Sequence, residues 1–121
     1  YFGQRLGEGS RAYEKYKLSE RRYLGPTSMD HELAAIMANM GHVREGNVVF
    51  DPYVGTGSIL VAAAHHKART VGGDIDIRVI QFGKKAKKSN ERLDVWTNFD
   101  DYGLPRPMAL LRCDAHVEVC P

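Results

Sequence analysis

The segment 47–64, NVVFDPYVGTGSILVAAA, organises the rest of the chain. Its apolar run at 48–50 predicts a buried strand of a parallel sheet, and Asp51 stands at the carboxyl end of that strand. Gly55 and Gly57 predict a tight turn, and the apolar stretch 58–64 predicts a helix. A strand, a glycine turn and a helix N-terminus are typical of a nucleotide-type binding loop, because the free N–H groups of the helix point at the ligand.

The residues around this turn separate the possible ligands. A phosphate-binding loop needs Gly-Lys-Ser/Thr, whereas Gly57 is followed by Ser58 and Ile59. A dinucleotide fingerprint needs a third glycine where Leu60 stands. The Asp51 carboxylate would repel a pyrophosphate and attract a cation. S-adenosyl-L-methionine, a positively charged nucleoside, fits best; a turn without a ligand is disfavoured, because a buried aspartate is costly without a use.

Two further aspartates follow predicted strands. The stretch 70–73 predicts a second strand ending at Asp74, and 108–112 predicts a third strand followed by Asp114. Because the carboxyl ends of parallel strands meet at one edge of a sheet, we expect both to lie with Asp51 around one crevice. Asp74 is placed to hold ribose hydroxyls, and Asp114 suits the exocyclic amine of adenine.

The remaining periodicity predicts two more helices. The first spans 29–40, begins after a cap at Thr27, Ser28 or Asp30 and ends at Gly41. Its apolar side chains at helical spacing predict a buried face: Leu33, Ile36, Met37 and Met40. The other spans 77–90 and carries four lysines, which form either a solvated face or a weak RNA patch. Residues 91–107 read as a connection.

The first 24 residues interleave basic side chains with tyrosines. Such a segment either holds RNA, with cations on phosphates and rings on bases, or packs its tyrosines on the domain. We expect mostly irregular structure there, and we divide the chain into a lead-in at 1–24 and a partial methyl-donor-binding domain at 25–121.

Composition narrows the class of protein. The 121 residues suffice for one small domain, and a net charge of +2 confines any nucleic-acid contact to local patches. The two cysteines are too few for a zinc site, so we assign no metal. Without a signal peptide or an apolar run of membrane-spanning length, we expect a reduced, cytoplasmic location.

Five stretches together resemble the catalytic subunit of the tRNA (guanine-10-N2) methyltransferases, a THUMP-type family of class I methyltransferases. They are GPTSMDHELAAIMANMGHV, VVFDPYVGTGSILVAAA, VGGDIDIRVIQFGK, ERLDVWTNFDDYGL and LLRCDAH. The resemblance implies an α/β fold of the Rossmann-like class I type, of which this chain would supply the N-terminal half, three parallel strands with flanking helices. Residues 11–24 resemble the linker from that family's RNA-binding THUMP domain.

The resemblance also implies roles for individual residues. Thr27 and Ser28 would lie near the methionine end of S-adenosyl-L-methionine. Its amino-acid part would be bound by Asp51, Gly55 and Gly57. Asp74 would hold the ribose, and Asp114 the adenine amine, with a backbone N–H from Ala115. The reaction would transfer methyl to the N2 amine of a tRNA guanosine, with a small zinc-containing activator subunit as partner.

One part of the family pattern is absent. The Asp/Asn-Pro-Pro-aromatic motif that contacts the target amine does not occur in this sequence, so no catalytic residue is assigned. We therefore expect the cofactor-binding portion of the enzyme, inactive alone. Two alternatives stay open: a methyltransferase acting on another amine, in nucleic acid or protein glutamine, and a non-catalytic fragment that binds RNA or a partner.

Overall fold

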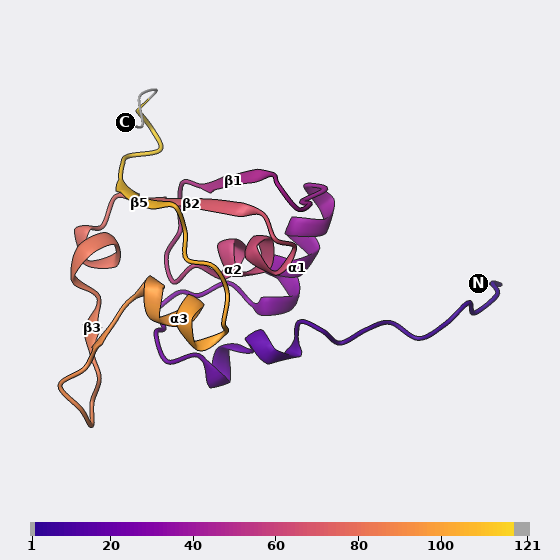
Figure 1. Ribbon diagram of the computed structural model, residues 1–121, viewed down its shortest axis with the longest axis horizontal. Coiled ribbons are helices and arrows are strands. Elements are labelled where there is room, and N and C mark those ends of the chain that lie inside the picture. Colours follow the sequence, from indigo (N-terminus) through magenta and orange to yellow (C-terminus); the bar gives the residue numbers. More distant parts are fainter. Residues whose placement is uncertain (1, 118–121) are drawn as a thin grey trace.

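The computed structural model describes residues 2–117 and is built on a parallel sheet of three strands (Figure 1). The strands are β1 (Val48–Asp51), β2 (Arg69–Asp74) and β5 (Ala109–Arg112), in the order β1-β2-β5. Both pairings are parallel, with Asp51 opposite Gly72 and Asp74 opposite Arg112. The predicted α/β fold is confirmed. In the described part of the chain, β1 is an edge strand that pairs only with β2.

The helices lie on one side of this sheet (Figure 1). They are α1 (His31–Met40), α2 (Ser58–His65) and α3 (Val95–Asp101). Asp30 caps α1, because its carboxylate accepts from the backbone N–H groups of Glu32 and Leu33. The largest core cluster joins α2 and α3 to the lead-in, and its fully buried members include Leu60, Val61, Val95 and Phe99. No helix in residues 2–117 is long and apolar enough to cross a membrane.

The predicted buried face of α1 is wrong. The helix buries Ala34, Ala35 and Ala38, and Ala34 and Ala38 pack with Ala62 of α2. Small side chains let the two helices approach closely, so α1 buries the face that carries its alanines and leaves the face with the larger apolar side chains exposed. The larger apolar side chains are between 43% and 78% exposed: Leu33, Ile36, Met37 and Met40. Strand β1 also differs from its prediction, since Val48 and Phe50 are exposed on the open face of the sheet.

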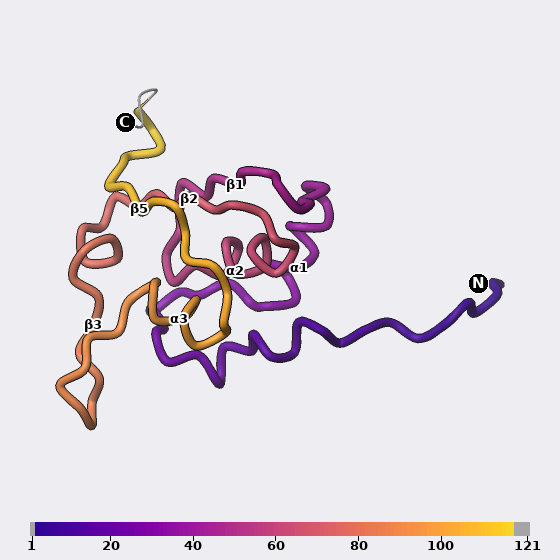
Figure 2. Tube along the Cα trace, viewed as in Figure 1, coloured from indigo at the N-terminus to yellow at the C-terminus, as the bar shows by residue number. Residues whose placement is uncertain are grey.

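The predicted helix 77–90 is also wrong. Only a π-helical turn, Arg78–Phe82, forms there, and the chain then enters a hairpin of β3 (Lys84–Lys85) and β4 (Arg92–Leu93). Gly83 causes the change, because its φ of 60° and ψ of −151° are accessible to glycine alone. Figure 2 shows the trace of this hairpin leaving the body of the molecule.

Helix α3 lies in the predicted connection 91–107. Its start is fixed by a capping box, in which Asp94 accepts from the Thr97 backbone N–H and the Thr97 hydroxyl accepts from the Asp94 N–H. Phe99 then anchors the helix in the core with no exposed surface. The Asp-x-x-Thr spacing was the available sequence signal for this helix.

The lead-in packs its aromatic side chains on the domain. It contains two 3₁₀ turns, Glu14–Tyr16 and Leu18–Glu20, and it buries Tyr16 and Tyr23. Arg21 is 5% exposed and donates to the Ser58 hydroxyl of α2 at 2.6 Å. Of the two interpretations of this segment, the structure shows the packed one for Tyr16 and Tyr23, whose rings are not free to stack on bases.

Asn98 of α3 joins the lead-in to the glycine turn. Its side-chain oxygen accepts from the Tyr23 N–H at 3.2 Å, and its nitrogen donates to the carbonyls of Tyr23 and Thr56, each at 3.0 Å. Asn98 is 1% exposed, so water cannot replace these bonds. One buried side chain therefore fixes the position of two segments that border the carboxyl edge of the sheet.

Gly83→Ala should lower the free energy of unfolding by at least 1–3 kcal/mol, roughly the cost of a backbone conformation that only glycine adopts. An added Cβ would also lie 2.2 Å from the Leu93 carbonyl oxygen. Urea denaturation measures the change. Gly103→Ala is the matched control, since φ is +64° there but no atom lies within 4 Å of the added Cβ. A loss at Gly83 no larger than at Gly103 would contradict the hairpin geometry.

Asn98→Ala should lower the free energy of unfolding by about 2–4 kcal/mol, because it leaves three buried backbone groups without partners. Asn90→Ala, at an exposed position, is the control and should change it by less than about 0.5 kcal/mol. Equal effects of the two substitutions in urea denaturation would refute the role of Asn98.

Candidate functional site

Two aspartates stand at the carboxyl ends of the neighbouring strands β1 and β2. Asp51 is 6% exposed, and its carboxylate accepts from the Tyr53 N–H at 2.9 Å. Asp74 is half-buried and accepts from the N–H groups of Gly55, at 3.1 Å, and Asp76, at 2.9 Å. The Asp74 carboxylate thus ties the loop after β1 to the loop after β2.

The electrostatics of this edge favour a cation. Burial raises the pKa of Asp51, the Tyr53 N–H lowers it in part, and the nearby Asp74 charge raises it further. No salt bridge joins Asp51 to a basic side chain in the part of the chain that the structure describes. A positively charged ligand group beside Asp51 would stabilise its ionised form, whereas a phosphate would meet two carboxylates.

Two cavities border the loop after β1, and Thr27, Gly55 and Thr56 line both. The smaller, of about 70 Å³, is also lined by Ser28 and Asp51. The larger, of about 570 Å³, extends past Asp74 and has a volume suited to a small-molecule cofactor. Other residues that line it are Tyr23, Asp76, Arg78, Val79 and Lys84.

Hydrogen bonds hold the segment before α1 against the glycine turn. The hydroxyls of Ser28 and Thr56 are 3.0 Å apart, and the Ser58 hydroxyl donates to the Met29 carbonyl at 2.9 Å. These contacts explain why Thr27 and Ser28, which precede the sheet in sequence, line the cavities at its carboxyl edge.

The structure brings together five of the eight residues expected to bind cofactor: Thr27, Ser28, Asp51, Gly55 and Asp74. Gly57, Asp114 and Ala115 are not among the residues that line the two cavities. Gly57 is the N-cap of α2 with a φ of 90°, and a Cβ there would lie 3.2 Å from Val95. The Asp114 carboxylate accepts from the His116 N–H at 2.9 Å.

Sequence reasoning missed part of the wall of the larger cavity. Arg78 forms a 2.7 Å ion pair with Asp76 and lowers its pKa to about 2. The Lys84 ammonium donates to the Leu24 carbonyl at 2.7 Å, which joins the hairpin to the lead-in. The spacing of Asp76 and Arg78, two residues apart, was a usable sequence signal for their ion pair. The position of Lys84 at the cavity could not be predicted, because the incorrect helix prediction placed it on a helix face.

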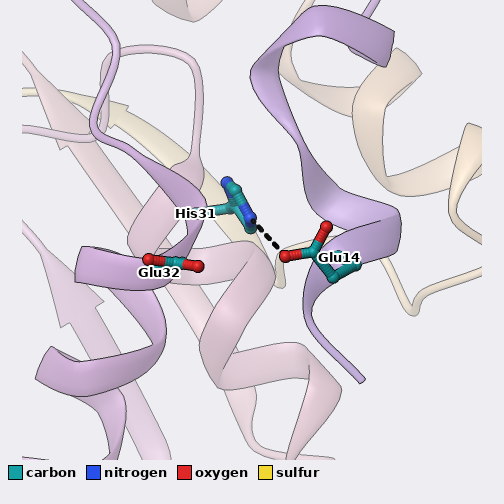
Figure 3. A group of neighbouring side chains, drawn as sticks. All are labelled: Glu14, His31 and Glu32. Carbon is teal, nitrogen blue, oxygen red and sulfur yellow. Dashed lines mark ion pairs between the residues drawn. The ribbon is translucent and has the colours of Figure 1, made fainter. Parts of the chain in front are cut away.

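A second group of polar side chains lies between the lead-in and α1 (Figure 3). Ligand atoms of Glu14, His31 and Glu32 lie within 4.8 Å of one another, and His31 Nε2 is 3.8 Å from a Glu14 oxygen. Glu14 also forms an ion pair with Lys17. Because a lysine already neutralises one carboxylate and Glu32 is exposed, we assign no ion to this group.

Comparisons with known proteins match this chain to a methyltransferase domain. The family model of the RMKL-like methyltransferase domain (UPF0020) matches residues 19–103. The chain is 48% identical over 116 residues to a Dictyostelium discoideum tRNA (guanine(10)-N(2))-methyltransferase, covering 94% of the chain and 22% of the relative. The human enzyme of the same name is 40% identical over 112 residues, covering 88% of the chain and 24% of the relative.

A solved structure shares the fold. A precorrin-8w decarboxylase of Methanobacterium thermoautotrophicum superposes with a TM-score of 0.54 at 22% identity, covering 77% of this chain and 42% of that one. The chain spans less than a quarter of the length of the curated relatives named above. The match over residues 19–103 covers well over half of the chain, which therefore belongs to the RMKL-like methyltransferase domain family.

Proposed function

We propose that the carboxyl edge of the sheet binds S-adenosyl-L-methionine. The observation that carries this proposal is the buried Asp51 carboxylate, which has no salt-bridge partner in the described chain and lines a cavity beside Gly55. A buried carboxylate of raised pKa is unfavourable in the unliganded fold and becomes favourable beside a cation. The cofactor carries two such groups, the sulfonium and the α-ammonium.

The two cavities suit the two ends of this molecule. The amino-acid end would lie in the smaller one, near Thr27, Ser28 and Asp51. The nucleoside would extend into the larger one, where Asp74 is available to accept from ribose hydroxyls. Gly55 lines both cavities, and Gly57 begins helix α2 beside it. Asp114 and Ala115 would reach the adenine from the end of β5, the third strand of the sheet.

We propose further that the protein carrying this chain methylates the N2 amine of a tRNA guanosine. Relatives named tRNA (guanine(10)-N(2))-methyltransferase, from Dictyostelium discoideum and human among others, support it. The bound cofactor would supply the methyl group. The residues described here would hold and orient that cofactor, and groups outside this chain would contact the target amine. The family resemblance adds a zinc-containing activator subunit as a partner.

Asp51→Asn should weaken binding of S-adenosylhomocysteine, which keeps the α-ammonium, by about ten- to hundredfold in calorimetry on the full-length protein. The amide still accepts from the Tyr53 N–H, so the loop should keep its shape. Because the folded pKa of Asp51 is raised, its ionised form weakens the fold as pH rises through that pKa. The variant should therefore unfold at neutral pH no more easily than the wild type.

Asp100→Asn is the matched control, since it removes the same charge at an exposed ion pair with Arg106. It should leave the affinity for S-adenosylhomocysteine unchanged. Weakened binding in both variants, or in neither, would count against Asp51 as the cation-binding group.

The full-length protein, with its activator, should transfer a tritiated methyl group from S-adenosylmethionine to unmodified tRNA. Replacing the target guanosine by inosine, which lacks the N2 amine, should abolish incorporation. The isolated 121-residue chain should show no turnover, since it lacks the Asp/Asn-Pro-Pro-aromatic motif. Undiminished incorporation into the inosine tRNA would refute the N2 assignment, and turnover by the isolated chain would refute the need for the missing motif.

A further inference from the structure

The hairpin of β3 and β4 concentrates positive charge beside the larger cavity. Four of the five residues 84–88 in this segment are lysines: Lys84, Lys85, Lys87 and Lys88. All four are exposed, and the last two stand in the loop between the strands, which the bond from the Ala86 N–H to the Glu91 carbonyl closes at 2.9 Å. Because the whole chain has a net charge of only +2, the remainder of the chain is on balance acidic.

The acidic side chains around the hairpin are paired with other cations. Glu91 bonds to Arg22 of the lead-in at 3.2 Å, and Asp94 contacts Arg92 at 3.5 Å. No salt bridge engages Lys85, Lys87 or Lys88 in residues 2–117. Three ammonium groups thus face solvent without counter-charges from the protein, which is the electrostatic condition for binding a polyanion.

The hairpin is anchored at the rim of the larger cavity. Gly83 and Lys84 line that cavity, Lys84 bonds to the Leu24 carbonyl, and Leu93 is buried in the core. At roughly 3.3 Å per residue, the tip lies within about 13 Å of the rim. The hairpin therefore projects from a fixed base (Figure 1), and a polymer that it holds would pass close to the cofactor.

We propose that the hairpin 84–93 binds the phosphate backbone of the RNA substrate through Lys85, Lys87 and Lys88, and so positions the RNA beside the cavity. This inference rests on the proposed function, which supplies the RNA. The tip, 86–91, has no aromatic side chain to stack on a base, so contact would be with phosphates and independent of base sequence. Lys84 is left out, because it lines the cavity and binds the Leu24 carbonyl.

The test compares two triple variants of the full-length protein. One is Lys85→Gln, Lys87→Gln and Lys88→Gln. The control is Arg44→Gln, Lys67→Gln and Arg69→Gln, which removes as many exposed cations near the amino ends of β1 and β2. Affinity for unmodified tRNA is measured from low to high salt, affinity for S-adenosylhomocysteine by calorimetry, and methyl transfer over a range of tRNA concentrations.

The hairpin variant should bind tRNA roughly tenfold more weakly near physiological salt, and its salt slope should fall by about 1 for each phosphate that a lysine no longer neutralises. The KM for tRNA should rise while kcat and S-adenosylhomocysteine affinity stay unchanged, because contacts distant from the reacting atoms are equally strong in the ground and transition states. The control variant should match the wild type. Arginine at the three hairpin positions should restore binding.

Several results would overturn this inference while leaving the proposed function intact. The first is an unchanged salt slope in the hairpin variant, and the second is an equal loss of tRNA affinity in the control variant. The third is a hairpin variant that binds anionic lipid vesicles more weakly than the wild type does but keeps its affinity for tRNA. A wild-type protein that binds S-adenosylhomocysteine but neither binds nor methylates tRNA would instead refute the proposed substrate, whatever the hairpin variant does.

Discussion

The shape of the candidate site depends on the bonds that the Asp74 carboxylate makes across the strand ends. It accepts from the Gly55 N–H of one loop and from the Asp76 N–H of the next, and the Val54 N–H adds a 2.8 Å bond to the Gly73 carbonyl. The loops after β1 and β2 therefore hold a fixed relative position. Because Gly55 lines both cavities, their shapes depend on this connection, and any ligand that engages Asp74 also acts on the glycine turn.

Local sequence was sufficient to predict the sheet and the two aspartates at its carboxyl edge, whereas the family resemblance placed Thr27 and Ser28 at the site. Short apolar runs located β1, β2 and β5, and the aspartates that follow the first two were predicted to meet because parallel strands end at one edge. The absent lysine and third glycine also predict a cation-binding edge, where Asp51 is 6% exposed. Each of these predictions depends on neighbouring residues or on a general rule of parallel sheets, so no knowledge of tertiary packing was needed.

The incorrect predictions concern choices that tertiary packing makes. The spacing of Leu33, Ile36 and Met37 indicates an apolar stripe on α1, but only the contact with α2 decides that the alanine face is buried. Asn98 has an ordinary polar sequence context, and its importance follows from three backbone groups that converge on it in the fold. Gly83 is a different case, because a glycine that follows a short helical pattern is a local signal for the end of a helix. The prediction gave more weight to the helix propensity of the residues around it.

The Gly83 conformation also determines what the lysines after it are able to do. In a continued helix, four lysines at spacings i, i+1, i+3 and i+4 would have shared one face of that helix. In the hairpin, two of them share the loop, and the nearby Glu91 and Asp94 are paired with Arg22 and Arg92. The net charge of +2 is therefore unevenly distributed, with Asp51 and Asp74 at the carboxyl edge of the sheet and exposed lysines on the hairpin beside it. This separation suits the proposed reaction, which would bring a cationic methyl donor to a polyanionic RNA, because each ligand would meet the opposite charge while the two proposed sites remain adjacent.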